Sequence, residues 1–181
     1  MGRRIANDID EFIKIWESDL KFELDDVDEE GNPVSYHVYK YDFENIEIDF
    51  ELSIPFSKEI IDRMEMKIFQ NIGTIKFNDC KFLHKLYIGN SDKNIEFTNN
   101  CYFEDTIRSF RFKSNLTFKN CTIKKLNFED AIFGDELKKR DKKGKVRFRN
   151  CDLFDINFNN ATFNSLADFW SCTFHYPITF Y

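Results

Sequence analysis

Cysteine is the residue type in this chain with the widest chemical range, and its spacing limits what it can do. The five cysteines are Cys80, Cys101, Cys121, Cys151 and Cys172. Zinc sites usually hold cysteines in pairs two to four residues apart, and neither such a pair nor a histidine at matching spacing is present. An odd, widely spaced set is also a poor disulfide framework. We therefore expect reduced thiols, no metal and a cytoplasmic protein.

Histidines and carboxylates do not form a recognisable catalytic set. His37, His84 and His175 are far apart in the sequence. The densest acidic run, residues 25–30, falls at a predicted turn and does not match the spacing of an EF-hand loop. Glycine-rich phosphate loops, His-Glu-x-x-His and Gly-x-Ser-x-Gly are all missing from the sequence. The sequence therefore predicts no catalytic, metal or cofactor site, and we do not expect an enzyme.

One cluster of basic residues interrupts an otherwise mixed charge distribution, and only Asp141 opposes it. Its members are Lys138, Lys139, Arg140, Lys142, Lys143, Lys145, Arg147 and Arg149. Two interpretations are open, a solvated surface loop and a binding site for an anionic partner. That partner could be a nucleic acid, lipid headgroups, an acidic protein or this chain's own acidic N-terminal segment. Because the Lys-rich loop carries no interleaved aromatic residue, nucleic acid is the disfavoured member of this set.

A short sequence motif, which we call the phrase, recurs along the chain and predicts how the fold positions these residues. The phrase is Phe, any residue, Asn or Asp, a small residue, any residue and an apolar residue. It starts, with two looser copies included, at Phe77, Phe97, Phe118, Phe128, Phe148, Phe158 and Phe169. The residue two before the Phe is also apolar in most copies, and apolar residues two apart share one face of a strand. Each five-residue step is therefore predicted to be a very short strand followed by a corner.

This register gives the cysteines a structural role. All five occupy the small inward position, together with Ala131 and Ala161. The residue just before each is Asn, Asp or Ser, and these side chains tolerate the backbone angles of a tight turn. We expect the cysteines to be small core residues and the Phe side chains to form a stacked core. Residues 134–145 break the phrase and are predicted to be a surface loop.

Residues 75–180 resemble the pentapeptide-repeat family in their five-residue step, their inward Phe or Leu and the small residue two before it. The resemblance implies a right-handed quadrilateral β-helix. The family favours Asn or Asp immediately before the central residue, and here only Asn127, Asp152, Asn157 and Asp168 comply among the clear copies. The chain is therefore similar to a degenerate branch of the family. The fold class we predict is mainly β, a pentapeptide-repeat-like solenoid with an α+β N-terminal cap.

The first 74 residues differ in charge from the rest. They hold 8 Lys and Arg against 19 Asp and Glu, a net charge of −11, whereas residues 75–181 carry +5. An amphipathic pattern that includes Ile5 predicts a helix over residues 5–20. Residues 34–43 are strand-like, the alternation from Ile46 to Phe56 predicts a strand or a first irregular coil, and residues 57–66 fit a short helix. We therefore expect an acidic cap at 1–74 and the repeat domain, with its basic loop, at 75–181.

The function that this pattern favours is a non-catalytic protein-binding or scaffold module, as the N-terminal part of a larger protein or alone. One alternative follows from the resemblance, a DNA-mimicking inhibitor or modulator of a type II topoisomerase; another is a carbohydrate-active enzyme on a β-helix. No apolar stretch is long enough to span a membrane. Near Tyr181 a new inward pair, Ile178 and Phe180, has begun without a cap, so either the chain continues or two chains stack end to end through this coil.

Overall fold

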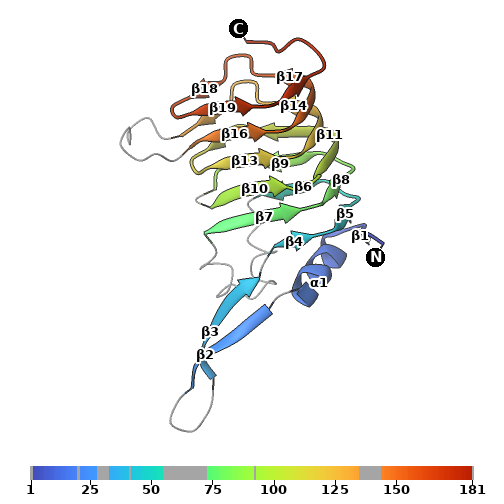
Figure 1. The fold of residues 1–181 in the computed structure, drawn as a ribbon, viewed down its shortest axis with the longest axis vertical. Coiled ribbons are helices and arrows are strands. Elements are labelled where there is room, and N and C mark those ends of the chain that lie inside the picture. Colours follow the sequence, from blue (N-terminus) through green and yellow to red (C-terminus); the bar gives the residue numbers. More distant parts are fainter. Residues whose placement is uncertain are drawn as a thin grey trace.

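The computed structural model describes residues 2–19, 21–27, 33–40, 42–54, 73–91, 93–134 and 144–180, with the backbone alone between residues 19 and 41. Within these ranges the chain has one helix and twenty strands, and eighteen of these strands form a stack along one axis (Figure 1). The helix predicted at residues 57–66 lies outside the described residues. The turn predicted at residues 25–30 is wrong in part, because residues 25–27 belong to strand β2 (Lys21–Val27).

Three parallel sheets form the stack. The first contains β1 (Arg4–Ala6), β5 (Ile46–Ile48), β6 (Leu52–Ile54), β8 (Lys81–Phe82), β9 (Leu86–Ile88), β11 (Tyr102–Ser109), β14 (Thr122–Asn127), β17 (Asp152–Asn157) and β20 (Thr173–Phe174). The second contains β4 (Phe43–Glu44), β7 (Thr74–Asn78), β10 (Asn94–Thr98), β13 (Leu116–Lys119), β16 (Val146–Arg149) and β19 (Ala167–Trp170). The third contains β12 (Arg111–Phe112), β15 (Ile132–Phe133) and β18 (Thr162–Phe163).

Successive coils lie in register, so the inward Phe residues of the second sheet stack on one another. Phe118 pairs with Phe97 below it and with Phe148 above it. The sheets also cross residue 74, because β4, β5 and β6 pair with β7, β8 and β9. Residues 43–54 therefore supply a first coil, as the alternation from Ile46 allowed. This mainly β stack of short parallel strands fits a β-solenoid. Separately, β2 pairs antiparallel with β3 (Pro33–Lys40).

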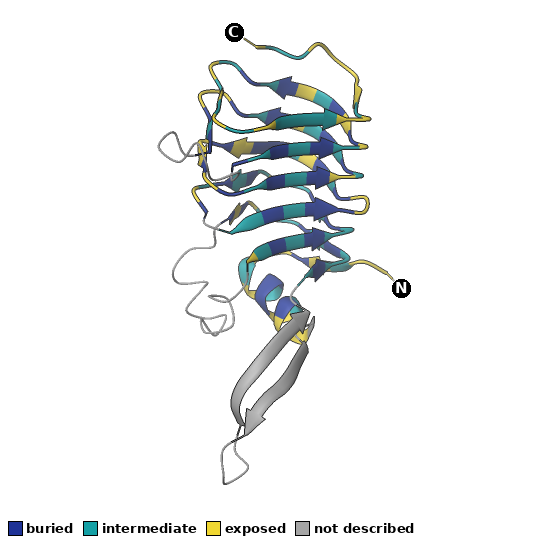
Figure 2. Cartoon of the chain, turned by 60° about the vertical axis from the view of Figure 1, so that its left-hand side comes forward, coloured by how far each residue is buried: buried dark blue, intermediate teal, exposed yellow. Residues whose placement is uncertain are grey.

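Stacked phenylalanine rings fill the interior, as the repeated phrase predicts. One column runs through the second sheet, with ring centroids 4.7–5.2 Å apart and planes within 16° of parallel; its rings are Phe43, Phe77, Phe97, Phe118, Phe148 and Phe169. Figure 2 shows the resulting alternation of buried and less buried residues along the strands. Offset stacking of this kind adds to the free energy of burying each ring. The column is therefore the axis of the core.

The corners of the coils use the left-handed backbone region, as their residue types predicted. A positive φ of 52–70° occurs at the residue before each small inward residue: Asp79, Asn100, Asn120, Asp130, Asn150, Asn160 and Ser171. Asn and Asp adopt this region at lower cost than other residues that have a Cβ atom. This chemistry sets one or two of the corners of each coil, where one side ends and the next begins.

Helix α1 (Ile9–Asp19) covers the N-terminal end of the stack. Phe12 stacks on Phe43 with ring centroids 4.8 Å apart, so the helix continues the Phe column beyond the first coil. The predicted start at residue 5 is wrong, because Asp8 caps the helix by accepting a hydrogen bond from the backbone N–H of Glu11. Ile5 instead lies in β1 and is 53% exposed, because residues 4–6 pair with β5.

Candidate functional site

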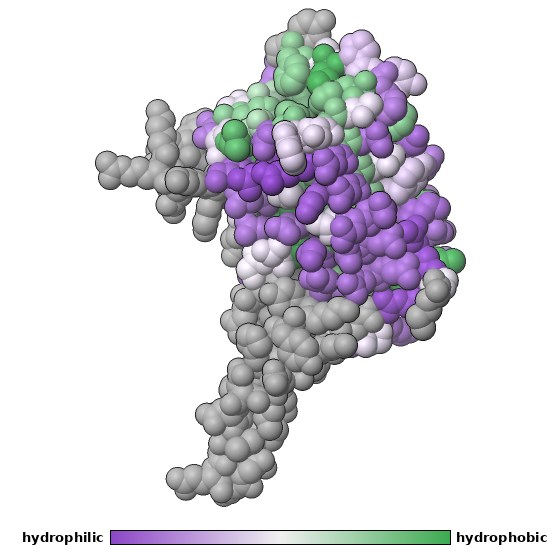
Figure 3. Space-filling view, viewed as in Figure 1, coloured by the Kyte–Doolittle hydropathy of each residue, from purple (hydrophilic) through white to green (hydrophobic). Residues whose placement is uncertain are grey.

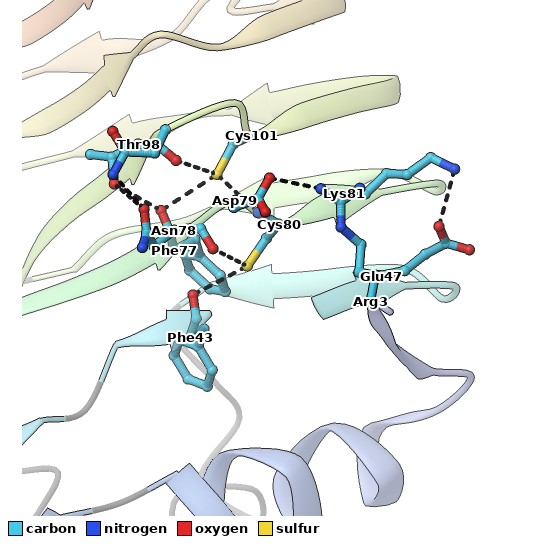
Figure 4. Close-up of polar contacts among 11 residues, drawn as sticks. Arg3, Phe43, Glu47, Phe77, Asn78, Asp79, Cys80, Lys81, Thr98 and Cys101 are labelled. Carbon is cyan, nitrogen blue, oxygen red and sulfur yellow. Dashed lines mark hydrogen bonds and ion pairs between the residues drawn. The ribbon is translucent and has the colours of Figure 1, made fainter. Parts of the chain in front are cut away.

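The cysteines form a column on one corner of the stack. Four of them, Cys80, Cys101, Cys121 and Cys151, are at most 2% exposed. Each donates its S–H to a backbone carbonyl of the coil below; Cys80 reaches the oxygen of Phe43 at 3.2 Å (Figure 4). Burial raises the pKa of the Cys80 and Cys121 thiols, which keeps them protonated. These cysteines are core residues, as the register predicted.

Cys172 departs from the expected uniform burial, because none of the described strands forms a coil above it. Its side chain is half-buried, and its Sγ lies 3.6 Å from the carbonyl oxygen of Trp170. All five cysteines are free thiols. Across the described part of the chain, His, Cys, Asp and Glu side chains form no group of three or more that could hold a metal ion. The cysteine column therefore offers stacking and hydrogen bonding, with one accessible thiol at its C-terminal end.

The two histidines whose side chains are described make surface contacts with carboxylates. His84 Nε2 lies 3.0 Å from Asp49 Oδ1, and His175 Nε2 lies 3.5 Å from Asp152 Oδ1. The His175 ring also stacks on Phe154, with centroids 4.0 Å apart. These pairs are partly exposed and bridge neighbouring coils, and among the described residues neither histidine contacts a Ser, Thr or Cys that it could activate. They link the edges of adjacent coils.

A pocket of about 180 Å³ lies where β11 and β14 end. Its lining residues are Arg108, Ser109, Phe110, Asn127, Glu129 and Asp130. Ser109 is 2% exposed, and its hydroxyl has no hydrogen-bond partner among the described groups. The residue occupies an inward position in register with Ile88. The pocket mixes both signs of charge without a pair of groups placed for acid–base chemistry.

Three of the eight predicted basic residues lie within the described ranges. Arg147 and Arg149 project from the outer face of β16, and Lys145 precedes that strand. The other five, Lys138, Lys139, Arg140, Lys142 and Lys143, lie outside the described residues. Gly134 and Gly144 bracket that segment with φ of 88° and 80°, and a Cβ on Gly144 would lie 2.2 Å from the Gly134 Cα. Gly134 and Gly144 therefore lie side by side, next to β16.

The register adds two residues to this basic surface that sequence reasoning did not assign to it. Lys119 on β13 pairs with Arg149, and Arg149 pairs in turn with Trp170 on β19. Trp170 is 62% exposed. Aligning the repeats that start at Phe148 and Phe169 places Arg149 and Trp170 at the same position, so the sequence did contain the signal. Figure 3 shows a hydrophilic band across this side of the stack, with hydrophobic surface toward the C-terminal end.

The C-terminal end of the stack is an apolar surface. Strands β18, β19 and β20 are the last in their sheets, so one edge of each is unpaired. The inward side chains of this coil are uncovered: Phe174 is 37% exposed and Phe180 is 58% exposed, while Phe163 and Phe169 are only partly buried. Unpaired edges over exposed rings are a favourable template for another polypeptide. We call this surface, Phe163, Phe169, Cys172, Phe174 and Phe180, the end coil.

No protein-family model, curated protein or solved structure matches this chain. Among the described helices, none is long and apolar enough to cross a membrane. Function is therefore inferred from the two surfaces above, the end coil and the basic side of the second sheet.

Proposed function

We propose that this chain is a non-catalytic protein-binding module that docks through its end coil. The observation that carries the proposal is the contrast between the two ends of the stack. At the N-terminal end the Phe column is closed by Phe12 and Trp16 of α1, which are 0% and 1% exposed. At the other end the equivalent rings remain in contact with water. An uncovered solenoid end of this composition is an interaction surface.

The shape that we propose is a right-handed quadrilateral β-helix of the pentapeptide-repeat kind. Its four-sided outline is supported by the burial pattern of β14, where the alternation breaks at two successive outward residues, Lys124 and Lys125. The same break occurs in β17 at Phe154 and Asp155. Each of these strands thus spans two sides of a coil, and β13 and β15 add the others. The right-handed winding is supported by the general chirality of parallel crossovers.

A second copy of this chain is the partner that the end coil fits best. Residues 161–180 contain Asp168 as their one carboxylate and no Lys or Arg, so two copies meet without strong repulsion. Each side of a coil is about four residues, or roughly 13 Å, long, and outward side chains widen the end face to about 20 Å, so two stacked ends bury on the order of 800 Å² in total. That area lies below the standard range for stable interfaces, and we expect a dissociation constant in the micromolar range.

Sedimentation equilibrium of the full chain over a range of concentrations tests this proposal. We expect a reversible monomer–dimer equilibrium that Phe180→Glu abolishes, because the change places a charge where two apolar surfaces meet. Phe110→Glu is the matched control, since Phe110 is 67% exposed on the flank of the stack and not at its end. A monomer at every concentration would overturn the proposal, and so would a dimer that both variants weaken equally.

Cytoplasmic location is part of the proposal, and the five free thiols support it because the cytosol keeps cysteines reduced. Neither the topoisomerase alternative nor the carbohydrate-active alternative is favoured by an observation on the described residues. A DNA mimic needs negative charge along its coils, whereas the outer positions of β13 and β16 carry Lys119, Arg147 and Arg149.

A further inference from the structure

The outer face of the second sheet changes character over its last three strands. Two columns of outward side chains cross β13, β16 and β19: Thr117, Arg147 and Asp168 form one, and Lys119, Arg149 and Trp170 form the other. Adjacent strands are about 4.8 Å apart, so the columns extend over roughly 10 Å. We call Lys119, Lys145, Arg147, Arg149 and Trp170 the basic face.

The charges of the basic face are largely uncompensated. Among the residues that the structure describes, Lys119, Lys145 and Arg147 form no ion pair. Arg149 Nη2 lies 3.7 Å from Asp168 Oδ2, and both side chains are partly exposed, so the pair is weak. Four cations against one carboxylate give a net charge of +3, although the whole chain carries −6. This local excess attracts anions.

Trp170 gives the basic face an aromatic platform. The other tryptophan, Trp16, is 1% exposed, whereas Trp170 is 62% exposed and lies in register beside Arg149. An indole left in water next to uncompensated cations can stack on the flat face of a base while the cations hold the adjoining phosphates. This arrangement supplies the exposed aromatic residue whose absence from the Lys-rich loop disfavoured nucleic acid at the level of the sequence.

We propose that the basic face binds single-stranded nucleic acid, with Trp170 stacking on one base and Lys119, Arg147 and Arg149 contacting neighbouring phosphates. Duplex nucleic acid keeps its base faces stacked internally and cannot use Trp170 in this way. An acidic protein would use the cations and leave the indole exposed. The basic face points outward from the stack, whereas the end coil consists of inward side chains of the last coil, so binding at the basic face does not require docking through the end coil.

Intrinsic fluorescence provides a direct readout, because Trp16 is buried and Trp170 is exposed. The probe is an oligothymidylate of about 15 nucleotides, and inorganic polyphosphate of similar charge is the comparison. We expect the oligonucleotide to quench Trp170 emission and polyphosphate to leave it unchanged. In anisotropy titrations with the labelled oligonucleotide, Trp170→Ala should weaken binding about 5- to 100-fold without changing its salt dependence.

Substituting a cation measures the electrostatic contribution to binding separately from the contribution of stacking on Trp170. Lys119→Gln should make the slope of log K against log salt less negative by about 0.7, the contribution of one phosphate contact in single strands. Lys113→Gln is the matched control, since Lys113 is exposed and follows β12 in the third sheet. The proposal is overturned if the oligonucleotide causes no quenching, if Trp170→Ala binds as tightly as the native chain, or if polyglutamate or anionic vesicles bind and the oligonucleotide does not.

Discussion

Replacing Phe148 by alanine removes a ring from the middle of the Phe column. Phe148 is 0% exposed, and its ring lies 4.9 Å from that of Phe118 and 5.0 Å from that of Phe169. The variant loses about 2–3 kcal/mol of burial free energy and two stacking contacts, each worth about 0.5–1.5 kcal/mol. We therefore expect the free energy of unfolding to fall by about 4 kcal/mol. This agrees with the usual range of about 3–5 kcal/mol for Phe→Ala in a core.

The same change at Phe169 should cost about half as much. Phe169 stacks on Phe148 from above, but no coil covers its other face, and it is only partly buried. Water can enter the space that the lost ring leaves, so the variant avoids most of the free energy cost of an empty cavity. We expect Phe169→Ala to lower the free energy of unfolding by about 2 kcal/mol. Lys113→Ala, at an exposed position, should change it by less than about 0.5 kcal/mol.

Urea denaturation measures all three variants in one assay. With a slope of about 2 kcal/mol per M, Phe148→Ala should lower the midpoint by about 2 M and Phe169→Ala by about 1 M. Trp16 and Trp170 lie at opposite ends of the stack, so their fluorescence also reports whether the ends unfold together. Equal midpoints for Phe148→Ala, Phe169→Ala and Lys113→Ala would refute the register on which the fold description depends.

Three further substitutions test individual features of the fold by thermal or urea denaturation. Ser109→Ala should raise stability by about 1 kcal/mol, because it removes a buried hydroxyl that has no described partner, and a loss of stability would contradict this. Asn160, with a φ of 54°, should tolerate glycine, whereas Asn160→Val should cost about 1–2 kcal/mol; equal effects would exclude a backbone cause. Asp8→Ala should cost about 1 kcal/mol by removing the cap of α1, and no change would show that the cap is not used.

The corners and the core could be predicted from the sequence because both depend on local residue chemistry. Asn or Asp in the left-handed region and Phe two residues after an apolar residue recur in most coils, so a repeated pattern revealed them. The start of α1 could also have been predicted, since Asp8 and Glu11 have the spacing of a capping pair. The amphipathic period that reached Ile5 was misleading, because pairing of residues 4–6 with β5 overrides it.

The basic face could be predicted only in part. The cluster that includes Arg147 and Arg149 is visible along the chain, but Lys119 and Trp170 join it through pairing between coils. The pairing of Lys119 with Arg149 depends on where the chain rejoins the stack after Gly134, and the length of a loop does not determine this point. The pairing of Arg149 with Trp170 follows from alignment of the repeats that start at Phe148 and Phe169. The open end coil was visible as an unfinished inward pair at Ile178 and Phe180, whereas the exposure of Phe174 and Cys172 needed the structure.

Thiol labelling at different protein concentrations tests docking through the end coil most directly. Cys172 lies in that coil and is half-buried, whereas Cys80, Cys101, Cys121 and Cys151 are at most 2% exposed. One thiol should therefore react quickly in dilute protein, and mass spectrometry of the labelled peptide should identify it as Cys172. If two copies stack end to end, its reaction rate will fall as the protein concentration rises through the micromolar range. A Cys172 rate that is the same at every protein concentration would contradict the proposed function.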